Sequence, residues 1–293
     1  MRDMKTARAV GAAVATTSIA ILAANTAPAL AGNGANFVTY DHHTGEKGET
    51  EIKLYQDFGK TGDGDRYLAQ LLEFEHSLTD QWVIAAYLES HDRHGDDWSF
   101  DGFRFETRYR LFDYGTPFNP VVYAEYINKK EGALYLREAV GRTDGHEEAG
   151  GEEEDEDARE HEFETKLILG HDFSNKLRFG FDVISEVNLK SGDWAFGYAT
   201  GISYEIYENE HHGAASRDNW NVKEVKLGVE LFGGLGDSVK GLTLDGSKTE
   251  QYAGVSLKTE FANGAQFMVG GAFGLTDDSQ DAILRTAVGW EFE

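Results

Sequence analysis

Four of the ten histidines form two adjacent pairs and are the residues best suited to hold a metal ion: His42, His43, His211 and His212. Neutral imidazole is a common ligand of zinc and copper. Neither pair has the ligand spacing of an established zinc motif, and ordinary surface histidines are the alternative interpretation. The sequence therefore offers these four as candidate metal ligands and calls for no cofactor.

A second group of candidates consists of charged side chains that alternate with apolar ones, as Arg104 and Glu106 alternate with Phe103 and Phe105. If such segments enclose a space, charges of both signs line it. The candidates are Arg104, Glu106, Arg108, Arg110, Glu125, Arg178, Asp182, Glu186, Lys226, Lys258 and Arg285. They form either an internal network of ion pairs that fills the space or the wall of a narrow polar channel.

No catalytic motif accompanies these residues. The sequence contains no G-x-S-x-G, no H-E-x-x-H and no P-loop. We expect a protein that is not an enzyme and assign no catalytic residue. A hydrolase remains an alternative, because a folded chain can bring serine and histidine together from different strands without a local motif.

The elements that position these candidates begin after a targeting segment. Residues 1–31 combine basic residues at the start, an apolar stretch over 9–24 and the exit sequence Ala29-Leu30-Ala31. These are the three parts of a secretory signal peptide, so we predict cleavage after Ala31 and a mature domain over 32–293. The chain has no cysteine, which suits passage through an oxidising periplasm.

Beyond residue 31, no apolar run is long enough for a spanning helix. Period-two alternation recurs instead, in segments long enough to cross a bilayer as tilted strands. We predict twelve strands, near 50–58, 66–76, 82–91, 101–112, 119–130, 160–173, 176–188, 193–207, 222–233, 250–261, 265–275 and 281–292. An even number is the rule for bacterial barrels.

Alternation also fits a soluble sandwich, so other features decide between the two folds. The predicted strands are long and nearly free of proline, and aromatic residues gather at their ends. The chain also ends in an alternating strand that contains Trp290 and Phe292. We therefore predict an all-β protein, a single antiparallel up-and-down barrel in the outer membrane of a Gram-negative cell, in contact with lipid and lipopolysaccharide.

The stretch LEFEHSLTDQW over 72–82, followed by Tyr87-Leu88-Glu89, resembles a hairpin of small outer-membrane proteins. It is similar to the porin-like barrels grouped with the MetA-pathway phenol-degradation family. The resemblance implies the fold, the location and passage of small organic molecules. It transfers no site residue.

Acidic residues are concentrated between the fifth and sixth predicted strands. Residues 131–159 include the run GHEEAGGEEEDED, which repels itself and has little to bury, so we expect a disordered external loop. Its negative field would favour cations. The formal charge of −25 also disfavours nucleic acid as a partner.

Together these features predict a narrow, cation-preferring channel or transporter for small solutes. The first alternative is a closed structural barrel whose histidine- and acid-rich loops bind divalent metal or a surface partner. The second is the outer-membrane hydrolase.

Overall fold

Twelve long strands close into a barrel. The computed structural model describes residues 35–60, 64–93, 98–131, 133–143, 159–209 and 218–292. Its strands are β1 (Thr50–Lys60), β2 (Arg66–Thr79), β3 (Trp82–Arg93), β4 (Trp98–Arg110), β5 (Asn119–Lys130), β6 (Arg159–Ser174), β7 (Leu177–Asn188), β8 (Trp194–Glu208), β9 (Val222–Asp237), β10 (Gly241–Leu242), β11 (Gln251–Phe261), β12 (Ala265–Gly274) and β13 (Ala282–Phe292).

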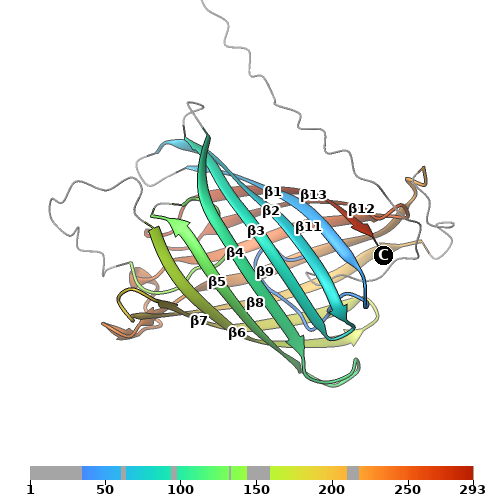
Figure 1. Ribbon diagram of the computed structural model, residues 1–293, viewed down its shortest axis with the longest axis horizontal. Coiled ribbons are helices and arrows are strands. Elements are labelled where there is room, and N and C mark those ends of the chain that lie inside the picture. Colours follow the sequence, from blue (N-terminus) through green and yellow to red (C-terminus); the bar gives the residue numbers. More distant parts are fainter. Residues whose placement is uncertain are drawn as a thin grey trace, which may run out of the picture.

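Antiparallel pairing runs from each long strand to the next, and β9 pairs directly with β11 (Figure 1). The ring closes where β13 pairs with β1, with Arg285 opposite Asp57. The two-residue β10 pairs with β9 and stands outside the ring of twelve. The predicted fold class and all twelve predicted strands are therefore confirmed.

Most strand boundaries differ from the prediction by one to four residues, and two of the largest shifts are at β4 and β9. β4 begins at Trp98 instead of 101, and β9 continues to Asp237 instead of 233. The end of β9 is the glycine-rich stretch Gly233-Gly234-Leu235-Gly236, which has no apolar alternation to reveal a strand. It still pairs with β8 as far as Asp237, so the hydrogen-bonded ladder continues where the sequence pattern stops.

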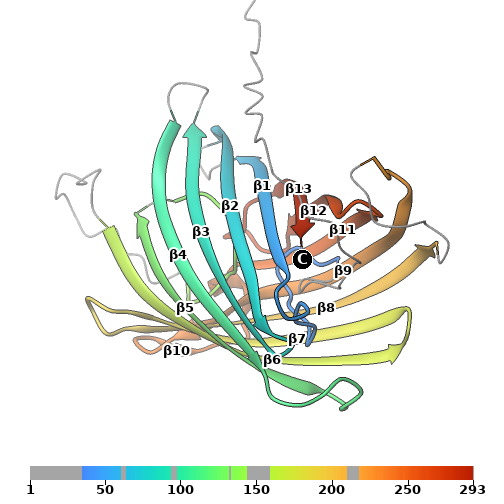
Figure 2. The ribbon, with the colours of Figure 1, turned by 45° about the vertical axis from the view of Figure 1, so that its right-hand side comes forward.

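Apolar side chains point outward and charged ones inward. In β4, Phe105 is 57% exposed, whereas its neighbours Arg104 and Glu106 are each 3% exposed. The same alternation of burial recurs through the other long strands, whose tilt is visible in Figure 2. This is the inverse of a soluble protein and matches a barrel whose outer surface meets lipid.

Helical structure in the described part of the chain is confined to one 3-10 turn, Gly246–Lys248. No helix in those ranges is long and apolar enough to cross a membrane.

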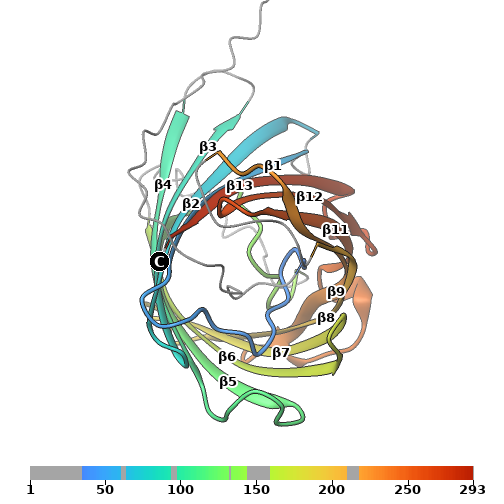
Figure 3. The same cartoon turned by 90° about the vertical axis from the view of Figure 1, so that its right-hand side faces the viewer.

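Two segments outside the strands occupy the interior. Residues 35–44, which we call the N-terminal plug, precede β1, and residues 133–143, the inward loop, follow β5. Figure 3 looks through the ring of strands and shows both inside it. Phe37 and Val38 of the plug join Leu136 and Ala139 of the inward loop in one buried cluster, together with wall residues such as Phe232. An apolar core therefore lies inside an otherwise charged barrel.

Candidate functional site

The N-terminal plug lies in a groove made by glycines. Gly170, Gly180 and Gly201 are cross-strand neighbours on β6, β7 and β8. A Cβ atom at these positions would collide with His42, Tyr40 and Asn36, respectively. The missing side chains thus create room for the plug backbone across three adjacent strands.

Wall carboxylates satisfy the plug's backbone donors. Glu230 on β9 accepts hydrogen bonds from the N–H groups of Phe37, Val38 and Thr39, the last two at 2.9 Å. The Thr39 hydroxyl donates to the same carboxylate at 2.9 Å. On β7, Asp182 accepts from the N–H of Tyr40 at 2.9 Å. Because these donors are buried, the wall supplies what water would supply to an exposed segment.

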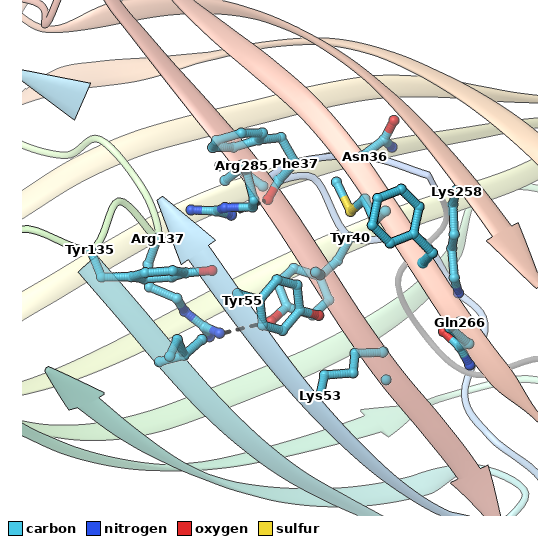
Figure 4. Close-up of a pocket in the computed structure, with 16 residues that line it drawn as sticks. Asn36, Phe37, Tyr40, Lys53, Tyr55, Tyr135, Arg137, Lys258, Gln266 and Arg285 are labelled. Carbon is cyan, nitrogen blue, oxygen red and sulfur yellow. Dashed lines mark hydrogen bonds between the residues drawn. The ribbon is translucent and has the colours of Figure 1, made fainter. Parts of the chain in front are cut away.

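The inward loop carries two charged side chains into this network. Arg137 Nη2 donates to the hydroxyls of Tyr40 and Tyr123 at 3.3 and 3.1 Å, and to Glu106 and Glu125 at 3.1 and 3.3 Å. Figure 4 shows Arg137 extending toward Tyr40. The two interior segments therefore contact each other as well as the wall.

Glu138 forms the second connection of the loop. It lies 3.2 Å from Arg104 and 3.4 Å from Lys166. Burial acts to raise the pKa of Glu138, but Lys166 and Arg104 outweigh it and lower the pKa to about 2. The carboxyl group is therefore ionised at neutral pH and holds the loop to β4 and β6.

Arg285 joins four parts of the barrel. Its guanidinium donates to both oxygens of Asp57 at 2.6 Å, across the seam between β13 and β1. It also donates to the carbonyl oxygen of Phe37 at 2.8 Å and to that of Leu136. One side chain thus binds the seam, the N-terminal plug and the inward loop.

The structure places all eleven predicted lumen residues on the interior face. Ten are buried, and the side chain of Arg178 is 15% exposed. Two pairs within the set are brought together, Arg104 with Glu125 at 3.4 Å and Arg108 with Glu106 at 2.7 Å. The others contact groups outside the set, as Arg285 contacts Asp57.

Sequence reasoning missed Tyr40, Arg137 and Glu138, because their segments lie outside the alternating strands. The structure also differs from the expected external loop over 131–159. Residues 133–143 enter the barrel, since Leu136 and Ala139 are apolar and find a buried cluster there. The adjacent apolar residues Tyr135 and Leu136 were the signal in the sequence that part of this segment is buried. The acidic run over 145–157 and the predicted signal peptide over 1–31 lie outside the described residues.

Free space between the two segments and the wall at β1, β12 and β13 is small. A cavity between β1, β12, β13 and the interior segments is lined by Tyr40, Tyr55, Arg137 and Arg285, among others (Figure 4). Its room for water-sized molecules is about 40 Å³. Since one water needs about 10–15 Å³ by this measure, the cavity holds a few water molecules and no organic solute.

The predicted histidine pair at 42–43 is buried at the end of the barrel that holds the β6–β7 turn. His42 Nε2 and His43 Nε2 lie 3.3 and 3.5 Å from Asp172 Oδ2 of β6. His43 Nδ1 lies 3.0 Å from Asp41 Oδ1. Burial lowers the pKa of His43, against the raising effect of Asp41, so this imidazole is neutral at neutral pH. His211 and His212 lie outside the described residues.

No protein-family model matches the chain, and no curated protein matches it. Solved structures share its fold. An outer membrane channel from Pseudomonas putida F1 aligns with a TM-score of 0.50 and 11% identity, over 86% of this chain and 98% of that one. The NanC porin aligns with a TM-score of 0.45 and 10% identity, over 83% and 99%. The translocator domain of the autotransporter NalP from Neisseria meningitidis has a TM-score of 0.45 and 13% identity, over 86% and 90%. The alignment at a TM-score of 0.50, together with the closed ring of twelve strands, shows the fold of a small, porin-like outer-membrane β-barrel.

Proposed function

We propose that the protein is a narrow, cation-preferring outer-membrane channel for small solutes, closed in this conformation by the N-terminal plug and the inward loop. The observation that carries the proposal is that two segments, not the wall side chains alone, fill a charged interior. Withdrawal of the N-terminal plug would leave a polar passage lined by the glycine groove. A barrel of twelve strands has a lumen wide enough for such a narrow passage.

The charge of the interior supports the preference for cations. Among the described residues, eighteen buried acidic side chains face eight buried basic ones. An excess of carboxylates in a confined space of low dielectric attracts cations and repels anions. If the acidic run at 145–157 lies at the mouth of the barrel, its negative charge would add to this field.

The outward apolar face supports the proposed location. Leu167 and Val183, which are cross-strand partners, are each 45% exposed. We expect this surface to contact lipid, and lipopolysaccharide in the outer leaflet. The predicted signal peptide supplies the route of export.

Conductance in planar bilayers tests the proposal. The wild-type protein should show rare, small openings. Under a salt gradient, the sign of its reversal potential should be that of a channel that passes cations better than anions. Arg137→Ala removes the contacts between inward loop, plug and wall and should make openings more frequent. Lys176→Ala, at a half-exposed position beside Glu205, serves as the control. If both variants and the wild type stay silent, the channel proposal is wrong.

The hydrolase alternative has a separate test. We propose that the protein is not an enzyme, so serine-reactive probes should leave the purified barrel unlabelled.

A further inference from the structure

The geometry points to a site for a divalent transition-metal cation such as Zn²⁺, formed by His42 and His43 of the N-terminal plug and Asp172 of β6. The site lies on the interior face at the end of the barrel that holds the β6–β7 turn. The proposed site does not depend on the proposed channel activity. It keeps one of the two histidine pairs that the sequence offered, His42 and His43, and adds Asp172 as the third ligand.

The ligand spacing fits tetrahedral coordination. Zinc binds histidine nitrogen and carboxylate oxygen at about 2.0–2.2 Å, so neighbouring tetrahedral ligands stand roughly 3.3–3.5 Å apart. The two Nε2 atoms lie 3.3 and 3.5 Å from Asp172 Oδ2. His42 and His43 also each offer a ring nitrogen within 4.8 Å of the other, in a cluster that includes Asp41. Both imidazoles are thus at ligand-to-ligand distance from the Asp172 oxygen.

Both imidazoles direct Nε2 at the same oxygen of Asp172, at 3.3 and 3.5 Å. The His42 contact is also a side-chain hydrogen bond to that carboxylate. A cation between the three atoms would replace these contacts and would account for their common focus.

A second layer of contacts prepares the histidines as ligands. An ionised carboxylate can only accept, so His43 Nδ1 donates its proton to Asp41 Oδ1 and leaves the lone pair on Nε2. This carboxylate–histidine arrangement is the usual support of a metal-bound imidazole. Asp41 also accepts from the backbone N–H of His43 at 2.7 Å, which fixes the turn of the chain. In His42, which is 1% exposed, Nδ1 has no hydrogen-bond partner among the described residues, so this support is given to His43 and not to His42.

Arg178 holds the two carboxylates by their other oxygens. It lies 3.3 Å from Asp172 Oδ1 and 3.5 Å from Asp41 Oδ2. Asp172 Oδ2 therefore remains free for a metal, and Asp41 Oδ1 remains free for His43. Two carboxylates against one guanidinium leave a net negative charge for a divalent cation to neutralise. The side chain of Asp172 is 34% exposed, so water can reach the site and supply a fourth ligand.

Metal titration of the untagged protein in detergent micelles tests the site. We expect one Zn²⁺ per chain by calorimetry, and Co²⁺ should give the intense visible absorption of tetrahedral coordination. His42→Ala, His43→Ala and Asp172→Asn should each abolish the Co²⁺ absorption. Asp41→Asn should keep the stoichiometry and weaken the affinity by about 10- to 100-fold, as expected for a supporting carboxylate.

His171→Ala is the matched control, because His171 neighbours Asp172 on β6 but its ring stacks on Phe118 and meets Phe173 edge to face. It should bind metal as the wild type does. Heat-dependent mobility on gels and circular dichroism establish that each variant is folded. The proposal is overturned if the wild type gives no Co²⁺ absorption, or if folded His42→Ala and Asp172→Asn variants keep it.

Discussion

Glu230→Gln is expected to release the N-terminal plug. The carboxylate of Glu230 accepts four hydrogen bonds from Phe37, Val38 and Thr39, and one of them reaches Oε1 while the other three reach Oε2. Glutamine keeps the shape of the side chain but offers one accepting oxygen, and its NH₂ group then faces a donor. The plug therefore loses at least one hydrogen bond, and its remaining hydrogen bonds are made to an uncharged acceptor.

The size of the effect follows from the two kinds of bond. Hydrogen bonds to a charged acceptor contribute about 1.5–3 kcal/mol, and those between neutral groups about 0.5–1.5 kcal/mol. One lost bond and three weakened ones give about 6 kcal/mol if they add, and about 2–4 kcal/mol with the non-additivity of a shared network. Since 1.4 kcal/mol is a factor of ten, the released population should rise by about 30- to 700-fold.

Thiol labelling measures the release directly, because the chain has no cysteine of its own. Val38→Cys places a thiol at a position that is 7% exposed. Maleimide should label it slowly alone and faster when combined with Glu230→Gln. Glu224→Gln is the control, because Glu224 lies on the same strand and face but pairs with Lys226.

Two results would refute the reasoning at different steps. Equal labelling in the Glu230→Gln and Glu224→Gln backgrounds would show that this carboxylate does not hold the plug. Faster labelling without any rise in bilayer conductance would show that the plug is held as described but does not close the passage.

Three further predictions concern the groove, the outer face and the rim. Gly180→Val should expel the plug and raise conductance, because its Cβ would meet the plug backbone, whereas Gly271→Val has ordinary contacts and should conduct as the wild type does. Val183→Arg, near the middle of β7, should destabilise the barrel in vesicles by about 2–4 kcal/mol, measured by denaturant unfolding. Leu189→Arg, just after β7, should cost about 0–1 kcal/mol, because it lies near the membrane surface. Equal losses would contradict these two depths in the membrane. Burial raises the pKa of Glu49 from 4.5 to about 7, despite a backbone hydrogen bond, so its folded form holds a proton that the unfolded form releases. The contribution of Glu49 to stability should therefore fall by up to about 3 kcal/mol as pH rises from 4.5 to 7, and Glu49→Gln should remove this contribution from the pH dependence of thermal unfolding.

The strands and the lumen charges could be predicted from the sequence because both follow from local alternation. Side chains two residues apart share a face, so Arg104, Glu106 and Arg108 had to line one side together. The closed ring of twelve strands turns that side into an interior. Neither inference needs contacts between distant parts of the chain.

The interior segments could not be predicted in this way. The plug is held by Gly180, Asp182 and Glu230, which lie 140 to 193 residues further along the chain than the plug residues they contact. A glycine in a strand reads as a weak position until the backbone that fills its space is known. The pairing of His42 and His43 with Asp172 has the same origin, since it depends on where the plug crosses β6.

The contacts of Arg285 have a consequence for how the protein is built in the cell. This residue belongs to the last strand to be synthesised and faces Asp57 of the first. Its remaining donors are met by the carbonyl groups of Phe37 and Leu136. A barrel that sealed with either segment left outside would bury part of a guanidinium without acceptors, at a cost that disfavours closure. The pairing of β13 with β1 is therefore most favourable once both interior segments are in place.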